Sequence, residues 1–324
     1  AAASAMLDRL TGKRVYLPTL EAAWERMVTR RMYLTGGLGS LPVLESFGRD
    51  FELDPEFAYA ETCAAIGSLL WNWEMTQATG KARYSDLMEW QLYNAFLTGM
   101  GLEGTNYLYN NPLACRGGVT RKPWYEIPCC PSNLSRILAS LQQYIFSTRN
   151  KTVSIHQYIS SSLQEGGFQL EMDSQLPWKG KSVIHITAAP DEESTICLRI
   201  PSWSEKTTLW LNGEMQPLKM HTTQVKSPTA CGVDPRRAAW HEVRRTWKAG
   251  DMLELELDTK PALHSAHPHV KVHTGQAALT CGPLVYCLES IDNPEVDLFH
   301  VVVDPLSFTK TPCHEGSQDY HPIC

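Results

Sequence analysis

The feature that most constrains the fold is a change in hydrophobic periodicity near residue 150. Before that point, apolar residues recur every three or four positions, as they do along one face of an α-helix. After it, apolar and polar residues alternate, as they do in half-buried β-strands. We therefore expect a multidomain α + β protein in which a helical part precedes a β-rich part.

Four helices are expected in the first part of the chain. The segment 19–33 has its apolar side chains at Leu20, Trp24, Met27 and Val28, and ends before two glycines. Ser85 and Ser132 have the side chains preferred at helix N-caps, so the last two helices are expected to start there. The expected helices are 19–33, 63–79, 85–98 and 132–145.

The second part of the chain predicts short strands separated by turn residues such as Asn212-Gly213. Several short strands at this spacing are typical of a β-sandwich. Residues 227–245 and those after 307 lack clear periodicity, so we expect both to be loops. The expected strands are 152–159, 167–172, 182–187, 195–200, 207–211 and 252–257, with a further group across 268–303 that includes 277–288.

Length, hydropathy and charge exclude several classes of protein. The 324 residues suggest two or three domains, and 43% of them are hydrophobic, which excludes wholesale disorder. No apolar stretch approaches the roughly 18–20 residues that span a bilayer, so no membrane partner is expected. The net charge is −6 and no dense run of Lys or Arg occurs, so no nucleic-acid partner is expected. The first residues lack the pattern of a signal peptide.

Cysteines are the most informative chemical groups in the sequence. Of the 10 cysteines, Cys129 and Cys130 are adjacent, and neighbouring cysteines rarely bond to each other because the geometry is strained. With Glu61 and Cys63 they offer one carboxylate and three sulfurs, a ligand set that zinc accepts. The pair lies just before the helix expected to start at Ser132, and the positive end of that helix favours thiolates. A metal site or nucleophile, buried inert cysteines and a disulfide all stay open at this point.

Two further features have a structural and a functional interpretation. The loop Gly36-Gly37-Leu38-Gly39-Ser40, followed by Glu45, comes after a helix and is therefore no dinucleotide-binding motif. It is either a helix end with its loop or a functional loop that holds Glu45. His156 falls in an alternating strand, and we expect it to be a hydrogen-bonded structural residue.

Three motifs in the helical part resemble one known family. The segments GGLGS with Glu45, YAETCA (59–64) and W-x4-CCP-x-N (124–133) are similar to glycoside hydrolase family 127, the β-L-arabinofuranosidases. Weaker similarities follow in RIPSWS (199–204), WKAGD (247–251) and GPLVYC (282–287).

The resemblance implies a specific fold and a specific chemistry. It implies an (α/α)6 barrel followed by β-sandwich domains, and a retaining glycoside hydrolase that removes non-reducing terminal β-L-arabinofuranose or a related sugar. It implies Zn²⁺, a nucleophilic cysteine that also binds the zinc, a general acid/base and a sugar-binding tyrosine. Residue by residue, it makes Cys129 the nucleophile, Glu45 the acid/base and Tyr109 the substrate-binding tyrosine; the zinc ligands are Glu61, Cys63, Cys129 and Cys130.

The resemblance also implies that the barrel is incomplete, because an (α/α)6 barrel has twelve helices. We expect residues 1–148 to be the C-terminal part of the barrel, 149–258 a β-sandwich and 259–324 part of a second β-domain, and this chain alone to have weak activity or none. The expected partner is an oligosaccharide or glycoconjugate substrate, with a homodimer as a candidate assembly. Functional thiolates slightly favour the cytoplasm. The alternative is a carbohydrate-binding or structural zinc protein without catalysis.

Overall fold

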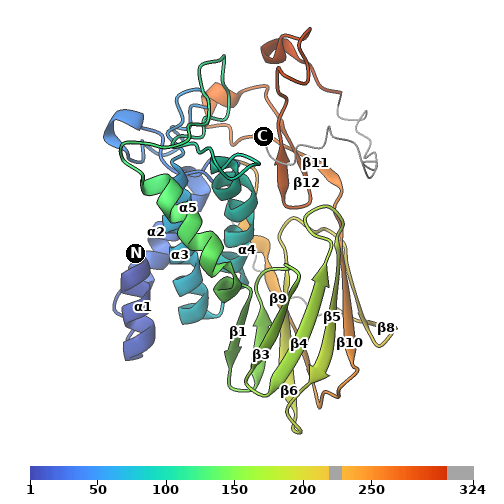
Figure 1. Ribbon diagram of the computed structural model, residues 1–324. Helices are drawn as coiled ribbons and strands as arrows, with labels where there is room; N and C mark the ends of the chain where they lie inside the picture. Colours follow the sequence, from blue (N-terminus) through green and yellow to red (C-terminus); the bar gives the residue numbers. More distant parts are fainter. Residues whose placement is uncertain (219–227, 305–324) are drawn as a thin grey trace.

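The computed structural model describes residues 1–218 and 228–304, within which five α-helices lie beside three β-sheets (Figure 1). The helices precede the strands in the sequence, so the prediction of a mixed protein with a helical part followed by a β-rich part is confirmed. The helices are α1 (Ala2–Thr11), α2 (Leu17–Arg30), α3 (Thr62–Thr79), α4 (Ala82–Gln91) and α5 (Cys129–Ser140).

The strands of the described residues form sheets of four, six and three strands. They are β1 (Phe146–Arg149), β2 (Thr152–Ile155), β3 (Ser161–Glu165), β4 (Phe168–Ser174), β5 (Lys181–Ala188), β6 (Ser194–Ile200), β7 (Thr207–Leu211), β8 (Glu214–Gln216), β9 (Ala239–Arg245), β10 (Met252–Leu257), β11 (Pro261–His264), β12 (Ala278–Cys281) and β13 (Leu284–Tyr286). The sheet orders are β1-β2-β6-β9, β3-β4-β5-β10-β7-β8 and β11-β12-β13.

The predicted apolar stripe of the segment 19–33 is the buried face of α2. Trp24, Met27 and Val28 are buried in a core that also contains residues of α1, α3 and α4. The Trp24 indole N–H donates a 2.7 Å hydrogen bond to the buried Asn72 of α3, which connects the two helices. The sequence analysis did not predict α1, a short helix at the start of the chain.

Both predicted N-caps are wrong, although the helices themselves are present. Ser85 lies buried inside α4, which begins three residues earlier, and its hydroxyl bonds to Thr76 and His156. The helix α5 begins at Cys129 and not at Ser132, whose hydroxyl donates back to the Pro128 carbonyl. The hydroxyl of Ser85 thus bonds to groups that tertiary packing supplies, whereas that of Ser132 bonds back to the carbonyl four residues earlier in the same helix.

The four-stranded and six-stranded sheets share one hydrophobic core. The predicted strands 182–187, 195–200, 207–211 and 252–257 match β5, β6, β7 and β10 to within one residue at each end. Alternate side chains of these strands point into the same core, as the period of two requires. Core side chains from five different strands are Val153, Phe168, Ile184, Leu198 and Leu253.

The prediction of a loop over 227–245 is wrong at its C-terminal end. Residues Ala239–Arg245 form β9, which pairs antiparallel with the whole of β6. Three of its seven residues are Arg or Glu, which hid the alternation. The ladder satisfies the backbone groups of β9 that face β6, whatever the side chains of β9 are. Residues 219–227 and 305–324, which contain the start of this segment and the predicted loop after 307, lie outside the described residues.

A buried ion-pair network fixes β6 to α4. Arg199 is fully buried and bonds to Asp86 at 2.7 Å and to Glu89 at 2.5 Å. Its Nε also donates to the His156 carbonyl at 2.7 Å. The predicted structural role of His156 is confirmed, because its ring nitrogens lie 2.8 and 2.7 Å from the hydroxyls of Ser85 and Ser147. Burial lowers the pKa of His156 to about 3, so the ring stays neutral.

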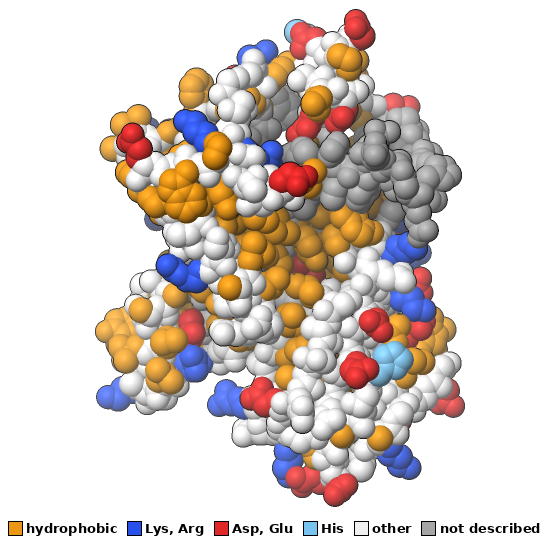
Figure 2. Space-filling model, in the orientation of Figure 1, with side chains coloured by type: hydrophobic (Ala, Val, Ile, Leu, Met, Phe, Trp, Pro, Cys, Tyr) orange, Lys and Arg blue, Asp and Glu red, His pale blue; other side chains and the backbone are white. Residues whose placement is uncertain are grey.

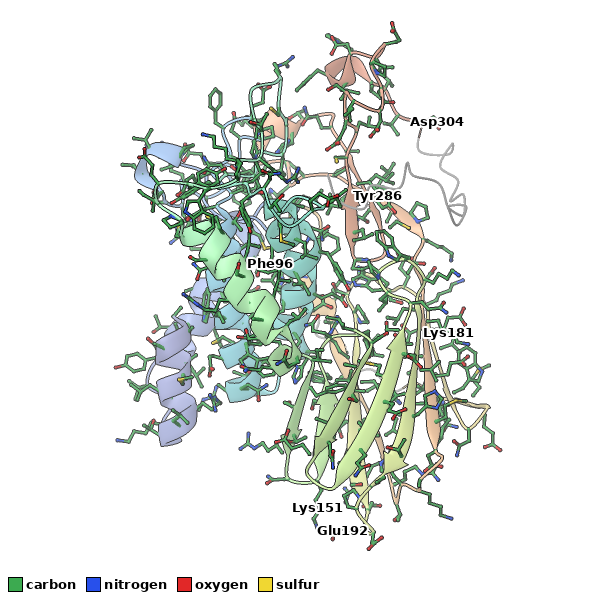
Figure 3. The ribbon with its side chains drawn as sticks, viewed as in Figure 1. Phe96, Lys151, Lys181, Glu192, Tyr286 and Asp304 are labelled. Atoms are coloured by element: carbon green, nitrogen blue, oxygen red, sulfur yellow. The ribbon has the colours of Figure 1, made fainter. Side chains whose placement is uncertain are left out.

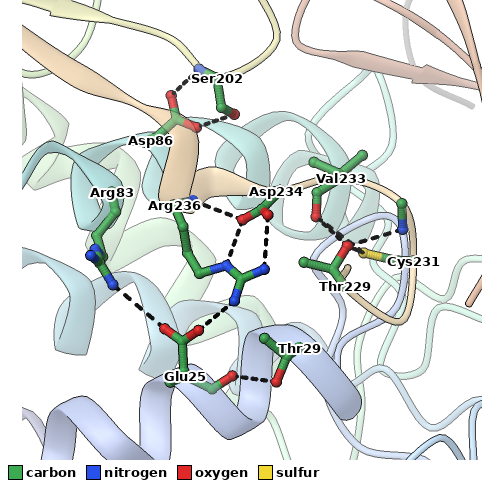
Figure 4. A network of polar contacts seen from close by, with 11 residues as sticks. Glu25, Thr29, Arg83, Asp86, Ser202, Thr229, Cys231, Val233, Asp234 and Arg236 are labelled. Atoms are coloured by element: carbon green, nitrogen blue, oxygen red, sulfur yellow. Dashed lines mark hydrogen bonds and ion pairs between the residues drawn. The ribbon is translucent and has the colours of Figure 1, made fainter. Parts of the chain in front are cut away.

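A second network holds the segment before β9 against the helices (Figure 4). Arg236 bonds to Asp234 at 2.7 Å and forms an ion pair with Glu25 of α2. Arg83 of α4 also lies 3.5 Å from Glu25. The third sheet is anchored in a similar way, because the Asn94 side chain bonds to the backbone of Pro283 and Val285, each at 2.8 Å.

The surface between the helices and the sheets is apolar. Figure 2 shows hydrophobic side chains gathered in a hollow there, and a groove of about 340 Å³ is lined mainly by aliphatic residues. Ion pairs such as Lys151–Glu192, at 2.6 Å, lie at the outer end of the sheets, far from the buried Phe96 (Figure 3). Among the described residues, no helix has the length and hydropathy to cross a bilayer.

Candidate metal centre and active site

Two helix N-termini meet at the site and supply its four candidate ligands. Glu61 is the N-cap of α3 with an extended backbone (φ −61°, ψ 135°), and Cys63 follows in the first turn. Cys129 and Cys130 are the first two residues of α5. Because Glu61 lies just outside the helix, its side chain points to the same place as that of Cys63, which two residues within a regular helix cannot do.

The four ligand atoms form a compact cluster, all within 4.8 Å of one another. The Cys63 and Cys130 sulfurs are 3.4 Å apart, and those of Cys129 and Cys130 are 3.8 Å apart. The Glu61 carboxylate lies 3.7 and 3.8 Å from the sulfurs of Cys129 and Cys130. Cys130 is fully buried and the other three are partly buried.

Four of the six separations between ligand atoms are close to those expected around a single tetrahedral ion. Three sulfurs at about 2.3 Å and one oxygen at about 2.0 Å from zinc stand about 3.5–3.8 Å apart in a tetrahedron. The four contacts span 3.4–3.8 Å, close to that range. Thiolates with one carboxylate suit zinc better than magnesium or calcium, which prefer oxygen ligands. The Glu61, Cys63, Cys129 and Cys130 cluster could therefore hold a metal ion of the zinc type.

The protonation of the thiols reflects their crowding. The hydrogen bond between the thiols of Cys63 and Cys130, together with the one that the Asn133 amide donates, lowers the pKa of Cys63 to about 7. The pKa of Cys130 is raised by its hydrogen bond to Cys63 and by burial, and that of Cys129 by burial and by the nearby Cys63. One thiolate thus forms readily. Its negative charge then disfavours the ionisation of a second thiol, because like charges repel at this distance. A cation among the sulfurs would compensate for this repulsion.

Asn133 is a neighbour of the cluster that the sequence analysis quoted in a motif without giving it a role. Its amide nitrogen donates to the Cys63 sulfur at 3.3 Å. Asn133 follows Cys129 by four residues and Cys130 by three, so helical spacing on α5 could have identified it. Such a donor holds a ligand in place and stabilises its thiolate.

Tyr109 lies against this cluster. Its carbonyl accepts a 3.0 Å hydrogen bond from the amide of Thr62, which stands between the candidate ligands Glu61 and Cys63, and the Cys129 thiol raises the pKa of the Tyr109 hydroxyl. The Tyr109 ring is 5.7 Å from that of Tyr125 and 6.2 Å from that of Tyr59. The structure therefore brings Tyr109 together with the four candidate ligands.

Glu45 lies in a separate exposed turn. Its backbone is left-handed (φ 46°, ψ 47°), and its amide donates to the Pro42 carbonyl at 3.4 Å. The loop that precedes this turn is joined to the segment before α3, because the Ala60 amide donates to the Gly39 carbonyl at 2.9 Å. Glu45 thus follows a loop that is hydrogen-bonded next to the candidate ligand Glu61.

Comparison with known proteins finds three domains of one family, matched one after another along the chain. The catalytic domain of the β-L-arabinofuranosidases of glycoside hydrolase family 127 matches residues 3–143, the middle domain of that family matches 152–259, and its C-terminal domain matches 261–316. The chain belongs to glycoside hydrolase family 127. The predicted family is therefore confirmed.

Individual family 127 proteins are similar over most of this chain. A non-reducing end β-L-arabinofuranosidase from Bifidobacterium longum subsp. longum is 33% identical over 310 residues, which are 90% of this chain and 44% of that protein. A solved family 127 β-arabinofuranosidase has a TM-score of 0.80 and 31% identity, over 90% of this chain and 46% of its own.

A second structure, a family 127 β-L-arabinofuranosidase from Geobacillus stearothermophilus T6, has a TM-score of 0.79 and 32% identity, with the same coverage of 90% and 46%. The chain therefore spans about half the length of the relatives it matches.

Proposed function

We propose that the protein is a retaining β-L-arabinofuranosidase in which Cys129 is the nucleophile and Glu45 the general acid/base. The observation that carries the proposal is the cluster of Glu61, Cys63, Cys129 and Cys130, beside which Tyr109 lies. Family 127 membership supports the reaction class, since the matched relatives are named β-L-arabinofuranosidases.

We propose that Glu61, Cys63, Cys129 and Cys130 hold Zn²⁺. When bound, the ion would keep Cys129 deprotonated and fixed in direction at neutral pH. Asn133 supports this arrangement from outside by its hydrogen bond to Cys63. The helix N-termini of α3 and α5 add positive potential at the same point.

The protein's own residues then perform two displacements at one carbon. The Cys129 sulfur attacks the anomeric carbon of the terminal sugar, and Glu45 gives its proton to the departing glycosidic oxygen. Glu45, now ionised, takes a proton from the water that attacks the same carbon and frees Cys129. Two inversions give net retention, as in glycosidases that use two carboxyl groups. Tyr109 binds the sugar beside Cys129.

The resemblance also supports proposals about organisation. We propose that residues 1–148 belong to an (α/α)6 barrel and that the two sheets sharing a core form the β-sandwich of 149–258. Residues 259–324 would be part of a further β-domain. The substrate is an oligosaccharide or glycoconjugate. The proposed functional thiolates suit a reducing compartment such as the cytoplasm.

The test uses protein expressed from the complete gene. Release of L-arabinose from a β-L-arabinofuranoside is measured for wild type, Cys129→Ser and Glu45→Gln, together with zinc content. Each change should lower kcat about a hundred- to ten-thousand-fold. Cys115→Ser and Glu103→Gln alter exposed residues outside the cluster and should leave kcat unchanged.

Two outcomes would contradict the proposal. Near-normal activity of either site variant would remove that residue from its role. Bound zinc without hydrolysis of any arabinofuranoside by the wild-type protein would favour the alternative, a carbohydrate-binding or structural zinc protein.

A further inference from the structure

The backbone that carries Glu61 into the cluster is strained. Ala60 is left-handed, with φ 35°, and Glu61 is extended, with φ −61° and ψ 135°, so the chain changes direction just before α3 begins. A left-handed backbone is unfavourable for alanine, because its Cβ comes too close to the following carbonyl oxygen. Such a conformation persists only where the surrounding structure holds it. Residues 60–62 therefore need a contact that fixes them.

Asn111 provides that contact on both sides of Glu61. Its amide nitrogen donates to the Ala60 carbonyl at 2.9 Å and to the Thr62 hydroxyl at 3.0 Å. The Thr62 hydroxyl in turn donates to the Leu108 carbonyl at 2.9 Å. Because a carbonyl only accepts hydrogen bonds, the nitrogen of the Asn111 amide must be the atom that faces Ala60. One side chain thus fixes the residues before and after the candidate ligand.

The other end of the Asn111 amide supports this interpretation. Its Oδ1 is buried and has no hydrogen-bond partner among the residues that the structure describes. Leaving a buried acceptor unpaired is unfavourable. A leucine of similar size would avoid that cost, so the bonds made by the nitrogen are what the asparagine contributes here. Thr62 is fully buried, and a Cβ at Gly99 would lie 2.7 Å from its Oγ1, which leaves the hydroxyl little room to move.

The Glu61 carboxylate depends on its backbone for its direction. In the described part of the chain, its hydrogen bonds are those with the thiols of Cys129 and Cys130, at 3.7 and 3.8 Å. Cys63, by contrast, receives a hydrogen bond from the Asn133 amide. A carboxylate without such a donor keeps its direction only if the residues on either side of it are fixed.

We propose that Asn111 is a positioning residue that directs the Glu61 carboxylate at the three sulfurs. It acts on the backbone of residues 60–62 and not on the carboxylate itself. Asn111 serves Glu61 as Asn133 serves Cys63. The inference rests on the proposed function, because it assumes that Glu61 is a zinc ligand.

The first measurement is the zinc affinity of protein expressed from the complete gene, by competition with a chelator. Asn111→Leu keeps the size of the side chain and removes both donors. It should weaken zinc binding about 10- to 100-fold, as the loss of groups that orient a metal ligand does. The same change made in a Glu61→Gln protein should alter zinc affinity less than about threefold, because an effect that acts only through Glu61 disappears with its carboxylate.

The second measurement is the absorption spectrum with Co²⁺ in place of zinc, which reports the ligands independently of activity. Absorption from sulfur-to-cobalt charge transfer depends on the number of thiolates, whereas the weaker visible bands depend on the identity and geometry of all the ligands. Asn111→Leu should keep the sulfur bands of the wild type and shift the visible bands to those of Glu61→Gln.

Two variants control the interpretation. Asn94→Leu removes an amide that also makes two hydrogen bonds, to the carbonyls of Trp90 and Pro283, both at 2.8 Å. It should lower the melting temperature without changing the zinc affinity or the Co²⁺ spectrum. Thr62→Val removes the hydroxyl that accepts from Asn111 and keeps the shape of the side chain. It should repeat the effects of Asn111→Leu, and it carries the same test if Asn111→Leu does not fold.

The outcomes distinguish the inference from the proposed function. Unchanged zinc affinity in Asn111→Leu, a loss that adds fully to that of Glu61→Gln, or disappearance of the sulfur bands would overturn the positioning role while the wild-type protein still binds zinc. Failure of the wild-type protein to bind zinc or Co²⁺ would overturn the proposed zinc site itself, and the role of Asn111 with it.

Discussion

The clearest stability prediction concerns Arg199, which joins the β-rich part to the helices. The change Arg199→Met keeps most of the side-chain volume and removes the charge. It leaves Asp86 and Glu89 buried, each with a side chain only 3% exposed, without their ion pairs at 2.7 and 2.5 Å. Removing one partner of a buried pair costs about 3–5 kcal/mol, because the remaining charge has no compensation. Two carboxyl groups are affected, so we expect the free energy of unfolding to fall by an amount in the upper half of that range.

The loss should depend on pH in a defined direction. Burial raises the pKa of Asp86 to about 6, and the attraction of Arg199 opposes that rise. Without Arg199 the pKa of Asp86 rises further above its unfolded value of about 3.9. A carboxyl with a raised folded pKa binds its proton more tightly in the native state, so stability falls as pH increases from about 4 through the folded pKa. The variant should therefore be less impaired at pH 5 than at pH 7.5.

Urea unfolding at both pH values, followed by tryptophan fluorescence, measures the free energy of unfolding. Arg244→Met on the neighbouring strand β9 is the matched control, since its pair with Glu193 is exposed and should be worth less than about 1 kcal/mol. A variant with Arg199, Asp86 and Glu89 all replaced by apolar residues should recover much of the loss. A cost below about 1 kcal/mol for Arg199→Met at pH 7.5 would refute the reasoning.

Three further predictions follow from named contacts. Asn133→Leu removes the donor to Cys63 and should weaken zinc binding about 10- to 100-fold in a chelator competition, with an unchanged melting temperature; unchanged affinity would argue against a supporting role. Gly36→Ala should lower the free energy of unfolding by about 1–3 kcal/mol, because the φ of Gly36 is 83° and the new Cβ would lie 2.7 Å from Gln91 Cγ. Gly12→Ala, with φ 69° and open space around the new Cβ, should lower it by about 1 kcal/mol. Equal losses of the two variants in thermal unfolding would contradict this difference. The pKa of His156 in the native state is lowered to about 3. Below about pH 6.5 the unfolded chain therefore binds a proton at His156 that the native state does not bind, and stability is lost as the pH falls from there. His156→Asn should therefore lose less stability than wild type between pH 7.5 and 5, and identical losses would exclude His156 as the cause.

The sequence by itself determined the order of the elements and the chemical types at the site. Periodicity located α2, α3 and the strands β5, β6, β7 and β10, because side chains that must be buried repeat with the geometry of the element that buries them. The motifs supplied a carboxylate and three thiols, and so limited the candidate metal to one that accepts sulfur.

Tertiary structure decided what local patterns could not express. The strand β9 exists because β6 offers it a full ladder, although three of its seven side chains are charged. Ser85 is a buried partner of His156 and not a helix cap, because the β-rich part brings that ring to α4.

The site shows the same division. The ligand atoms of Glu61, Cys63, Cys129 and Cys130 lie within 4.8 Å of one another only because two helix N-termini meet. The Tyr59 ring packs against the 36–40 loop only because Gly39 has no side chain. The sequence can specify which groups are present, since that is a property of each residue. Their distances depend on contacts between residues far apart in the chain, and those distances set the chemistry.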